Sequence, residues 1–154
     1  MTLSLAFLIG FLAGLRSLAP PAAVAWVAHL GWLKLPGALA LGGSVYSVGI
    51  FTVLALGELA ADKWAKIPAR TSAMPLVARM LMGGLTGACV AAGGGESALL
   101  GAALGAVGGV AGAFAGFHAR RRTAQALGVP DWYVAVLEDL VVIAGCLWVV
   151  SRFS

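Results

Sequence analysis

Apolar residues run along this chain in long blocks, and most charged residues fall between them. A helix needs about 20 mostly apolar residues to cross the hydrocarbon core of a bilayer. Five stretches of roughly this length each predict a membrane-spanning helix: residues 3–30, 35–57, 75–95, 97–117 and 132–150. None shows the alternation of polar and apolar residues that a transmembrane β-barrel requires. The pattern therefore predicts an all-α integral membrane protein, with residues 1–154 forming one domain.

The first block contains two features that interrupt a helix. Arg16 lies well inside it, and Pro20-Pro21 follow shortly afterwards. A proline in a helix interior removes a backbone hydrogen bond and clashes with the preceding turn. The block is therefore expected to kink or break at Pro20-Pro21. One broken span is the first interpretation, and a re-entrant hairpin that turns at the two prolines is the alternative.

The composition supports lipid as the solvent and excludes several functions. Hydrophobic residues make up 61% of the chain and charged residues 10%, against about 25% charged in soluble domains. The net charge of +4 does not indicate nucleic-acid binding, because no basic face with interleaved aromatic residues is present. Cys89 and Cys146 lie in apolar blocks without a CxxC motif, so neither a disulfide nor a zinc site is expected. His29 and His118 have no expected metal role, and no cofactor is predicted.

The basic residues predict how the chain lies in the membrane. Cytoplasmic connections of membrane proteins are enriched in Lys and Arg. With five spans, seven basic residues fall on the side of the N-terminus and two on the other. The seven are Lys63, Lys66, Arg70, Arg79, Arg120, Arg121 and Arg122, and the two are Lys34 and Arg152. This count predicts an inner-membrane protein with a cytoplasmic N-terminus and an external C-terminus.

Glycines in the fourth block predict close helix packing. They form two overlapping GxxxG rows, Gly101-Gly105-Gly109 and Gly108-Gly112-Gly116. A face without side chains lets another helix backbone approach closely, which is a main source of helix association in lipid. We expect a glycine zipper between the third and fourth helices, residues 75–95 and 97–117. A homodimer seam is compatible with the same pattern, and lipids are the other expected partners.

Six charged residues in or beside the apolar blocks form the candidate ion- or solute-binding site: Arg16, Glu58, Asp62, Arg70, Glu138 and Asp139. Ionised groups at membrane depth need a partner, water or a ligand. Glu58 and Asp62 are one helical turn apart and repel each other unless a cation, a proton or a basic side chain intervenes. Glu138 and Asp139 are adjacent and point about 100° apart, so at most one of them faces the core directly. The cluster either binds a small ion or solute or neutralises arginines.

A short internal similarity is also present. Residues 11–17 (FLAGLRS) resemble residues 113–119 (AFAGFHA). With five spans the first and fourth helices run in opposite directions, as the inverted repeats of many transporters require. The sequence therefore raises the hypothesis of an inverted repeat.

Three further motifs carry a family resemblance. They are GLRS at residues 14–17 followed by Pro20-Pro21, ELAADK at residues 58–63 and PART at residues 68–71. Together with the glycine-rich block and the Glu138-Asp139 pair, they resemble a bacterial membrane family catalogued as domain of unknown function 4126. The resemblance covers nearly the whole chain. It implies a small polytopic inner-membrane protein and no established activity.

Two functions remain in competition. The first is a small transporter or channel-like protein for an ion or solute, with charged residues lining a cavity that faces the cytoplasm. The alternative is a structural or assembly protein whose buried charges only lock the helices together. An enzyme is not expected, because the chain has no alcohol-phosphotransferase pattern, nucleophile elbow or HExxH motif. A cavity reaching Arg16 or Glu58 favours transport, whereas complete charge pairing in a dry core favours structure.

Overall fold

The computed structural model describes residues 1–64, 72–128 and 130–154, with the side chains of residues 62–64 outside that description. All regular structure in these ranges is helical. The six α-helices are α1 (Thr2–Leu15), α2 (Ala19–His29), α3 (Val45–Trp64), α4 (Ala73–Gly93), α5 (Ala98–Leu127) and α6 (Asp131–Val150). Two 3-10 helices, η1 (Gly37–Gly43) and η2 (Ser151–Phe153), precede α3 and follow α6.

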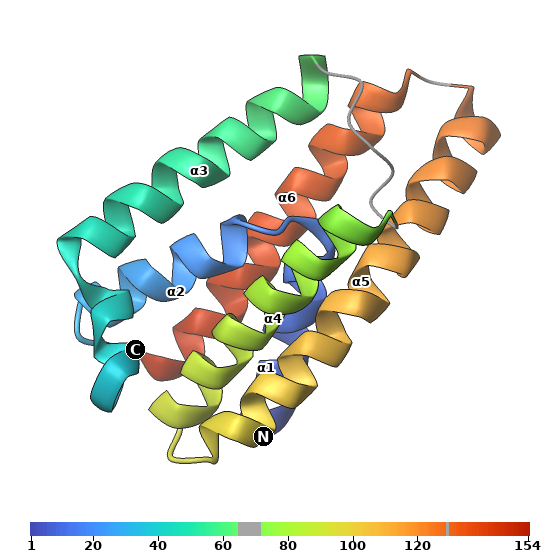
Figure 1. Ribbon diagram of the computed structural model, residues 1–154. Coiled ribbons are helices and arrows are strands. Elements are labelled where there is room, and N and C mark those ends of the chain that lie inside the picture. Colours follow the sequence, from blue (N-terminus) through green and yellow to red (C-terminus); the bar gives the residue numbers. More distant parts are fainter. Residues whose placement is uncertain (65–71, 129) are drawn as a thin grey trace.

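The helices form a bundle in which α1 packs closely against α4 and α5 (Figure 1). Buried apolar side chains of α1, among them Leu5, Ile9 and Leu12, contribute to the core together with residues of α2, α4 and α6. By contrast, α3 lies to one side and packs mainly against α2 and η1. Its outer face carries exposed apolar residues such as Ile50, Val53 and Leu56, as expected for a helix in contact with lipid.

The first apolar block consists of two helices that turn back on each other. At one end of the bundle, Thr2 lies against Gly94 and Leu33, beyond α2, lies against Gly93. Because Gly93 and Gly94 are neighbours, the chain enters α1 and leaves α2 at the same end. The course of the chain is therefore a hairpin, and whether this hairpin is re-entrant in a membrane stays a prediction.

The hairpin turns earlier than the sequence predicted. Helix α1 ends at Leu15, Arg16 is extended, and α2 begins at Ala19, so the break lies at residues 16–18. Pro20 and Pro21 instead stand in the first turn of α2. Proline is favoured there because the first N–H groups of a helix have no intrahelical acceptor. The prolines therefore start the second helix and do not break the first.

Among the described residues, three helical segments are long and apolar enough to cross a membrane: Ala73–Gly93, Ala98–Leu127 and Asp131–Phe153. A fourth is obtained if Gly37–Gly43 and Val45–Ala61, which meet at a bend of 60°, form one span. Helix α1 has 14 residues and is therefore about 21 Å long, shorter than the roughly 30 Å hydrocarbon core. The chain is a multi-pass helical membrane protein, and the predicted count of five spans is not confirmed.

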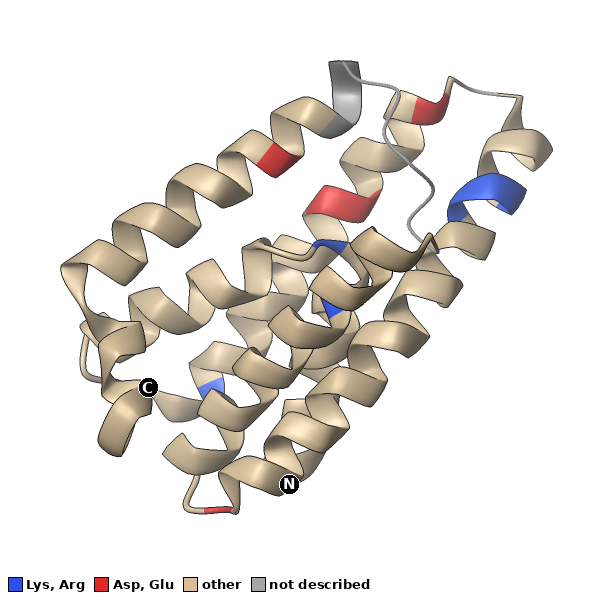
Figure 2. Cartoon of the chain, in the orientation of Figure 1, with Lys and Arg blue, Asp and Glu red and all other residues tan. Residues whose placement is uncertain are grey.

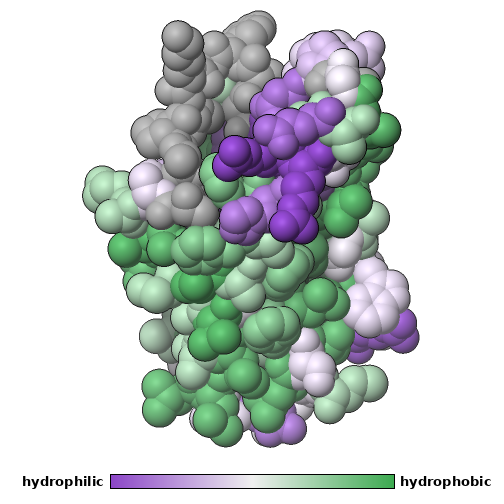
Figure 3. Space-filling model, turned by 90° about the vertical axis from the view of Figure 1, so that its right-hand side faces the viewer, coloured by the Kyte–Doolittle hydropathy of each residue, from purple (hydrophilic) through white to green (hydrophobic). Residues whose placement is uncertain are grey.

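Both termini lie at the same end of the bundle (Figure 1). Most acidic and basic residues gather toward the opposite end (Figure 2), and the space-filling view shows hydrophilic residues there above a largely hydrophobic body (Figure 3). The sequence placed the termini on opposite sides because it counted the first block as one crossing. Because α1 and α2 form a hairpin, the two termini lie together in the bundle, and their predicted placement on opposite sides of a membrane is not confirmed.

The hypothesis of an inverted repeat also loses its basis. Gly10 lies against Gly105, and Gly14 lies against Gly109 and Gly112. The residue numbers rise together along the contact, so α1 and α5 run in the same direction. An inverted repeat would require these two helices to be antiparallel.

The two glycine rows of α5 face two different helices. Gly101, Gly105 and Gly109 lie against the backbone of α4, whereas Gly108 and Gly112 lie against the backbone of α1. A Cβ atom at any of these five positions would come within 3.0 Å of a neighbouring helix. The contact of the second row with α1 was not predicted. That these rows drive helix association in lipid, as a glycine zipper, stays a prediction.

Replacing a packed glycine by leucine tests that prediction. We expect Gly109→Leu and Gly112→Leu each to lower the free energy of unfolding by about 3 kcal/mol or more, because overpacking forces the backbones apart. Gly57→Leu on α3 is the matched control, since a Cβ there meets nothing within 4 Å. Unfolding in detergent, followed by circular dichroism, measures the difference. Equal stability of all three variants would contradict the role of the rows.

Candidate functional site at the helix break

The break at residues 16–18 places two helix ends inside the bundle. It lies at the level of Glu58 on α3, Arg79 on α4 and Asp139 on α6, each six to eight residues from the polar end of its helix. At 1.5 Å per residue this is roughly 10 Å into the bundle. The last carbonyl groups of α1 have no intrahelical partners, and the N–H groups of Ser17 and Leu18 lie in the break before α2. At membrane depth other groups must satisfy them.

Arg79 satisfies the end of α1. Its Nη1 atom donates hydrogen bonds to the carbonyl oxygens of Gly14, at 2.7 Å, and Leu15, at 3.0 Å. The residue is buried, with 8% of its surface exposed. A cation at a helix C-terminus also interacts favourably with the helix dipole. Arg79 is therefore a cap supplied by another helix.

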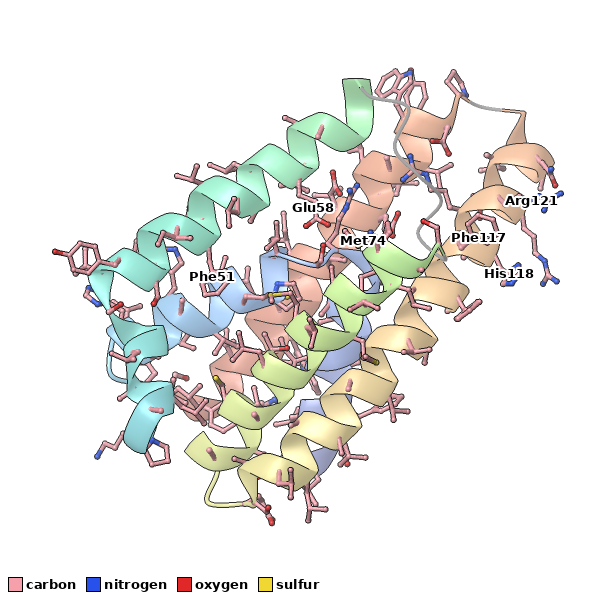
Figure 4. The ribbon with its side chains drawn as sticks, in the orientation of Figure 1. Phe51, Glu58, Met74, Phe117, His118 and Arg121 are labelled. Carbon is pink, nitrogen blue, oxygen red and sulfur yellow. The ribbon has the colours of Figure 1, made fainter. Side chains whose placement is uncertain are left out.

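Glu58 binds the backbone N–H groups of the break that immediately precede α2. Its Oε1 atom accepts hydrogen bonds from the Ser17 N–H at 2.9 Å and from the Ser17 hydroxyl at 2.6 Å. Its Oε2 atom accepts a third from the Leu18 N–H at 2.9 Å. Figure 4 shows the Glu58 side chain on the side of α3 that faces the break. A carboxylate at a helix N-terminus is the electrostatic counterpart of the Arg79 cap.

Arg16 and Asp139 form a buried ion pair beside these caps. Arg16 Nη2 lies 2.6 Å from Asp139 Oδ1. The two residues are only 2% and 7% exposed. The extended backbone of Arg16 (φ −136°, ψ 115°) places this residue outside both helices. With Glu58 and Arg79, the break thus contains two positive and two negative side chains.

A second charged group lies farther toward the polar end. Arg120 on α5 pairs with Asp131, and its Nη1 atom lies 3.8 Å from Glu138 Oε2 on α6. Glu138 and Asp139 thus approach different arginines. Their side chains are nearly equally buried, at 10% and 9% exposed, so the prediction that at most one of the two carboxylates faces the core is not confirmed.

The structure brings together three of the six predicted site residues. Arg16, Glu58 and Asp139 meet at the break, and Glu138 belongs to the neighbouring group around Arg120. The side chain of Asp62 and the whole of Arg70 lie outside the described residues.

Sequence reasoning missed Ser17 and Arg79 as site residues. Arg79 was counted as a charge of the connection between two spans, although it lies inside helix α4. An arginine within an apolar helix, close to small residues of the same segment, is a signal that could have identified it. Ser17 follows Arg16, but neither its hydroxyl nor its N–H identifies a partner on α3 from the sequence alone.

A cavity of about 230 Å³ lies beside the site, between α2, η1, α3 and α4. Neither Arg16 nor Glu58 lines it.

Within the described ranges, no group of three His, Cys, Asp or Glu residues could hold a metal ion. The two cysteines are both free thiols and buried.

Taken together, the fold and the break define a multi-pass α-helical membrane protein with a helical hairpin whose two halves meet at paired charges. Comparison of sequences then identifies the family. The family described as Domain of unknown function (DUF4126) matches residues 3–151, and this chain belongs to it. No curated protein and no solved structure matches the chain.

The buried ion pair gives a prediction about stability. Asp139→Asn keeps the shape of the side chain but removes the carboxylate charge that faces Arg16, so we expect the free energy of unfolding to fall by about 3–5 kcal/mol. Asp131→Asn is the matched control on the same helix, because the Asp131 side chain is 63% exposed and an exposed pair contributes at most about 1 kcal/mol. Denaturant titration in detergent measures both. Equal losses would contradict the importance of burial at this pair.

Proposed function

We propose that this protein transports a small ion or solute across the inner membrane, and that the helix break is its binding site. One observation carries the proposal: two helices meet at a break inside the bundle, and side chains from other helices bind the last carbonyl oxygens of α1 and the backbone N–H groups just before α2. Discontinuous helices in transporters point such ends at the substrate and the coupling ion. The Glu58 carboxylate stands where an anionic or polar group of a solute would bind. Such a solute, or a proton taken up by Glu58, would release α3 from the break.

The basic residues support an orientation in the membrane. Of the eight that lie outside the break, six belong to the end of α3, to the chain between α3 and α4 or to the last part of α5, and Lys34 and Arg152 lie toward the termini. The positive-inside rule then places the charged end in the cytoplasm. Since both termini lie at the other end (Figure 1), we propose that both are external. The N-terminus is therefore reassigned from the side that the sequence predicted.

Cysteine labelling of intact cells tests this orientation. In a variant with Cys89→Ala and Cys146→Ala, we expect a membrane-impermeant maleimide to label a cysteine tag before Met1 and also Ser154→Cys. Arg121→Cys should react only after the cells are opened. Labelling of Ser154→Cys but not of the N-terminal tag in intact cells would instead support five spans.

The alternative function, a structural or assembly protein, also has support. Each of the four charged side chains at the break contacts a partner within the chain, and the cavity is not lined by Arg16 or Glu58. A purely structural ion pair often tolerates joint replacement by apolar residues. Both glycine rows are occupied within one protomer, so a homodimer would need another surface.

A flux assay separates the two functions. In proteoliposomes tested with a panel of small ions and solutes, we expect Glu58→Gln to lower the flux about tenfold or more, the effect of losing a charge-assisted hydrogen bond of roughly 1.5–3 kcal/mol. Glu96→Gln, exposed at the α4–α5 turn, is the matched control and should leave the flux unchanged. Size-exclusion chromatography confirms that both variants stay folded. If the wild type moves nothing and Arg16→Met with Asp139→Leu is fully stable, the structural function holds.

A further inference from the structure

We propose that the cavity between α2, η1, α3 and α4 binds one acyl chain of an anionic membrane phospholipid, and that this chain completes the packing of α3. The proposal concerns a site separate from the charged break and does not depend on transport. Twelve residues line the cavity: Pro21, Val24, Ala25, Ala38, Leu39, Leu41, Gly42, Ser47, Phe51, Leu85, Thr86 and Cys89.

The wall of the cavity is suited to an apolar occupant. Its two hydroxyl groups already make hydrogen bonds within the protein. Thr86 Oγ1 donates to the carbonyl oxygens of Met82, at 2.8 Å, and Gly83, at 3.1 Å. Ser47 Oγ donates to the Leu41 carbonyl oxygen at 2.7 Å and accepts from the Ser44 hydroxyl at 3.0 Å. A polar solute that entered would lose its hydration and find little in return.

Size and access also favour an acyl chain. The volume of about 230 Å³ is below the roughly 300–1,000 Å³ of sites that enclose a whole small molecule. Leu85, at 39% exposed, and Leu41, at 72% exposed, lie on its rim. Because α3 packs against α2 and η1, the side of the cavity between α3 and α4 opens toward lipid. Figure 4 shows Phe51 on α3, from which it contributes to the wall.

One basic residue in the connection between two wall elements favours an anionic lipid. Lys34 is exposed and comes between α2 and η1, two of the elements that form the wall. Trp32, in the same connection, is 49% exposed, and tryptophan favours the level of the headgroups. A lysine at this level attracts an anionic headgroup. The headgroup therefore lies beside Lys34, and one acyl chain extends between α3 and α4.

An occupied cavity would provide α3 and α4 with a packing partner in addition to the residues that the structure describes. An apolar cavity left empty loses dispersion contacts along its whole wall. An acyl chain restores these contacts between α3 and α4, so the lipid acts as a structural component of the bundle. A side chain that fills the cavity should replace it.

Native mass spectrometry of the full chain in mild detergent tests the proposal. We expect wild type to retain one phospholipid, with phosphatidylglycerol retained in preference to phosphatidylcholine. Leu85→Trp should fill the cavity and lower retention at least about tenfold, because two or three methylene groups lose their site. Leu81→Trp is the matched control, one turn away on α4, exposed and outside the cavity wall. It should retain the lipid as wild type does.

A second measurement uses the native thiol in the wall. With Cys146→Ala, adding phosphatidylglycerol to delipidated protein should slow the reaction of Cys89 with N-ethylmaleimide about tenfold, since an occupied cavity blocks the thiol. This readout remains if Leu85→Trp fails to fold. Absence of any retained lipid, equal loss from both tryptophan variants, a second protein chain in place of the lipid, or unchanged Cys89 reactivity would each overturn the proposal.

Discussion

The need to satisfy backbone hydrogen-bonding groups away from water governs this fold. A chain that interrupts a helix at membrane depth leaves carbonyl and N–H groups that lipid cannot bind, and each costs several kcal/mol if left alone. The break at residues 16–18 creates two such ends. The structure answers with an arginine from α4 at one end and a glutamate from α3 at the other. Charged residues that are far apart in the sequence thus bind the backbone groups of a single helix break.

The glycine rows of α5 allow the helices to pack closely enough for these charged contacts to form. Helix α5 lies close to both α1 and α4 because its glycines carry no side chain on either contact face. The position of Arg79 depends on the same packing. Its carbonyl oxygen lies against Gly109 while its side chain reaches Gly14 and Leu15. The glycine rows and the polar site are therefore two parts of one arrangement, and a disturbance of the rows displaces the cap.

The sequence predicted the long helices well and the first block poorly, for one physical reason. Apolar length gave 75–95 and 132–150, close to α4 and α6. It ended the fourth block at residue 117, whereas α5 continues to Leu127, because a helix can extend beyond lipid into polar residues. Hydropathy records length but not direction, so it could not tell a crossing from a hairpin. The sequence predicted Arg16, Glu58 and Asp139 as site residues because buried charge is costly. Which of these side chains contact each other depends on helix packing, which the sequence does not show.

The hairpin also has a consequence for biosynthesis, which proceeds from the N-terminus. Ser17 appears 41 residues before Glu58, and Gly14 appears 65 residues before Arg79. Asp139 belongs to α6, the last long helix. A nascent hairpin at full depth would hold Arg16 in lipid before any of these partners existed, at a cost of several kcal/mol. Deep insertion of the first segment is therefore favoured only after the last helix has been made, so the earliest part of the chain to be synthesised is among the last to reach its final position.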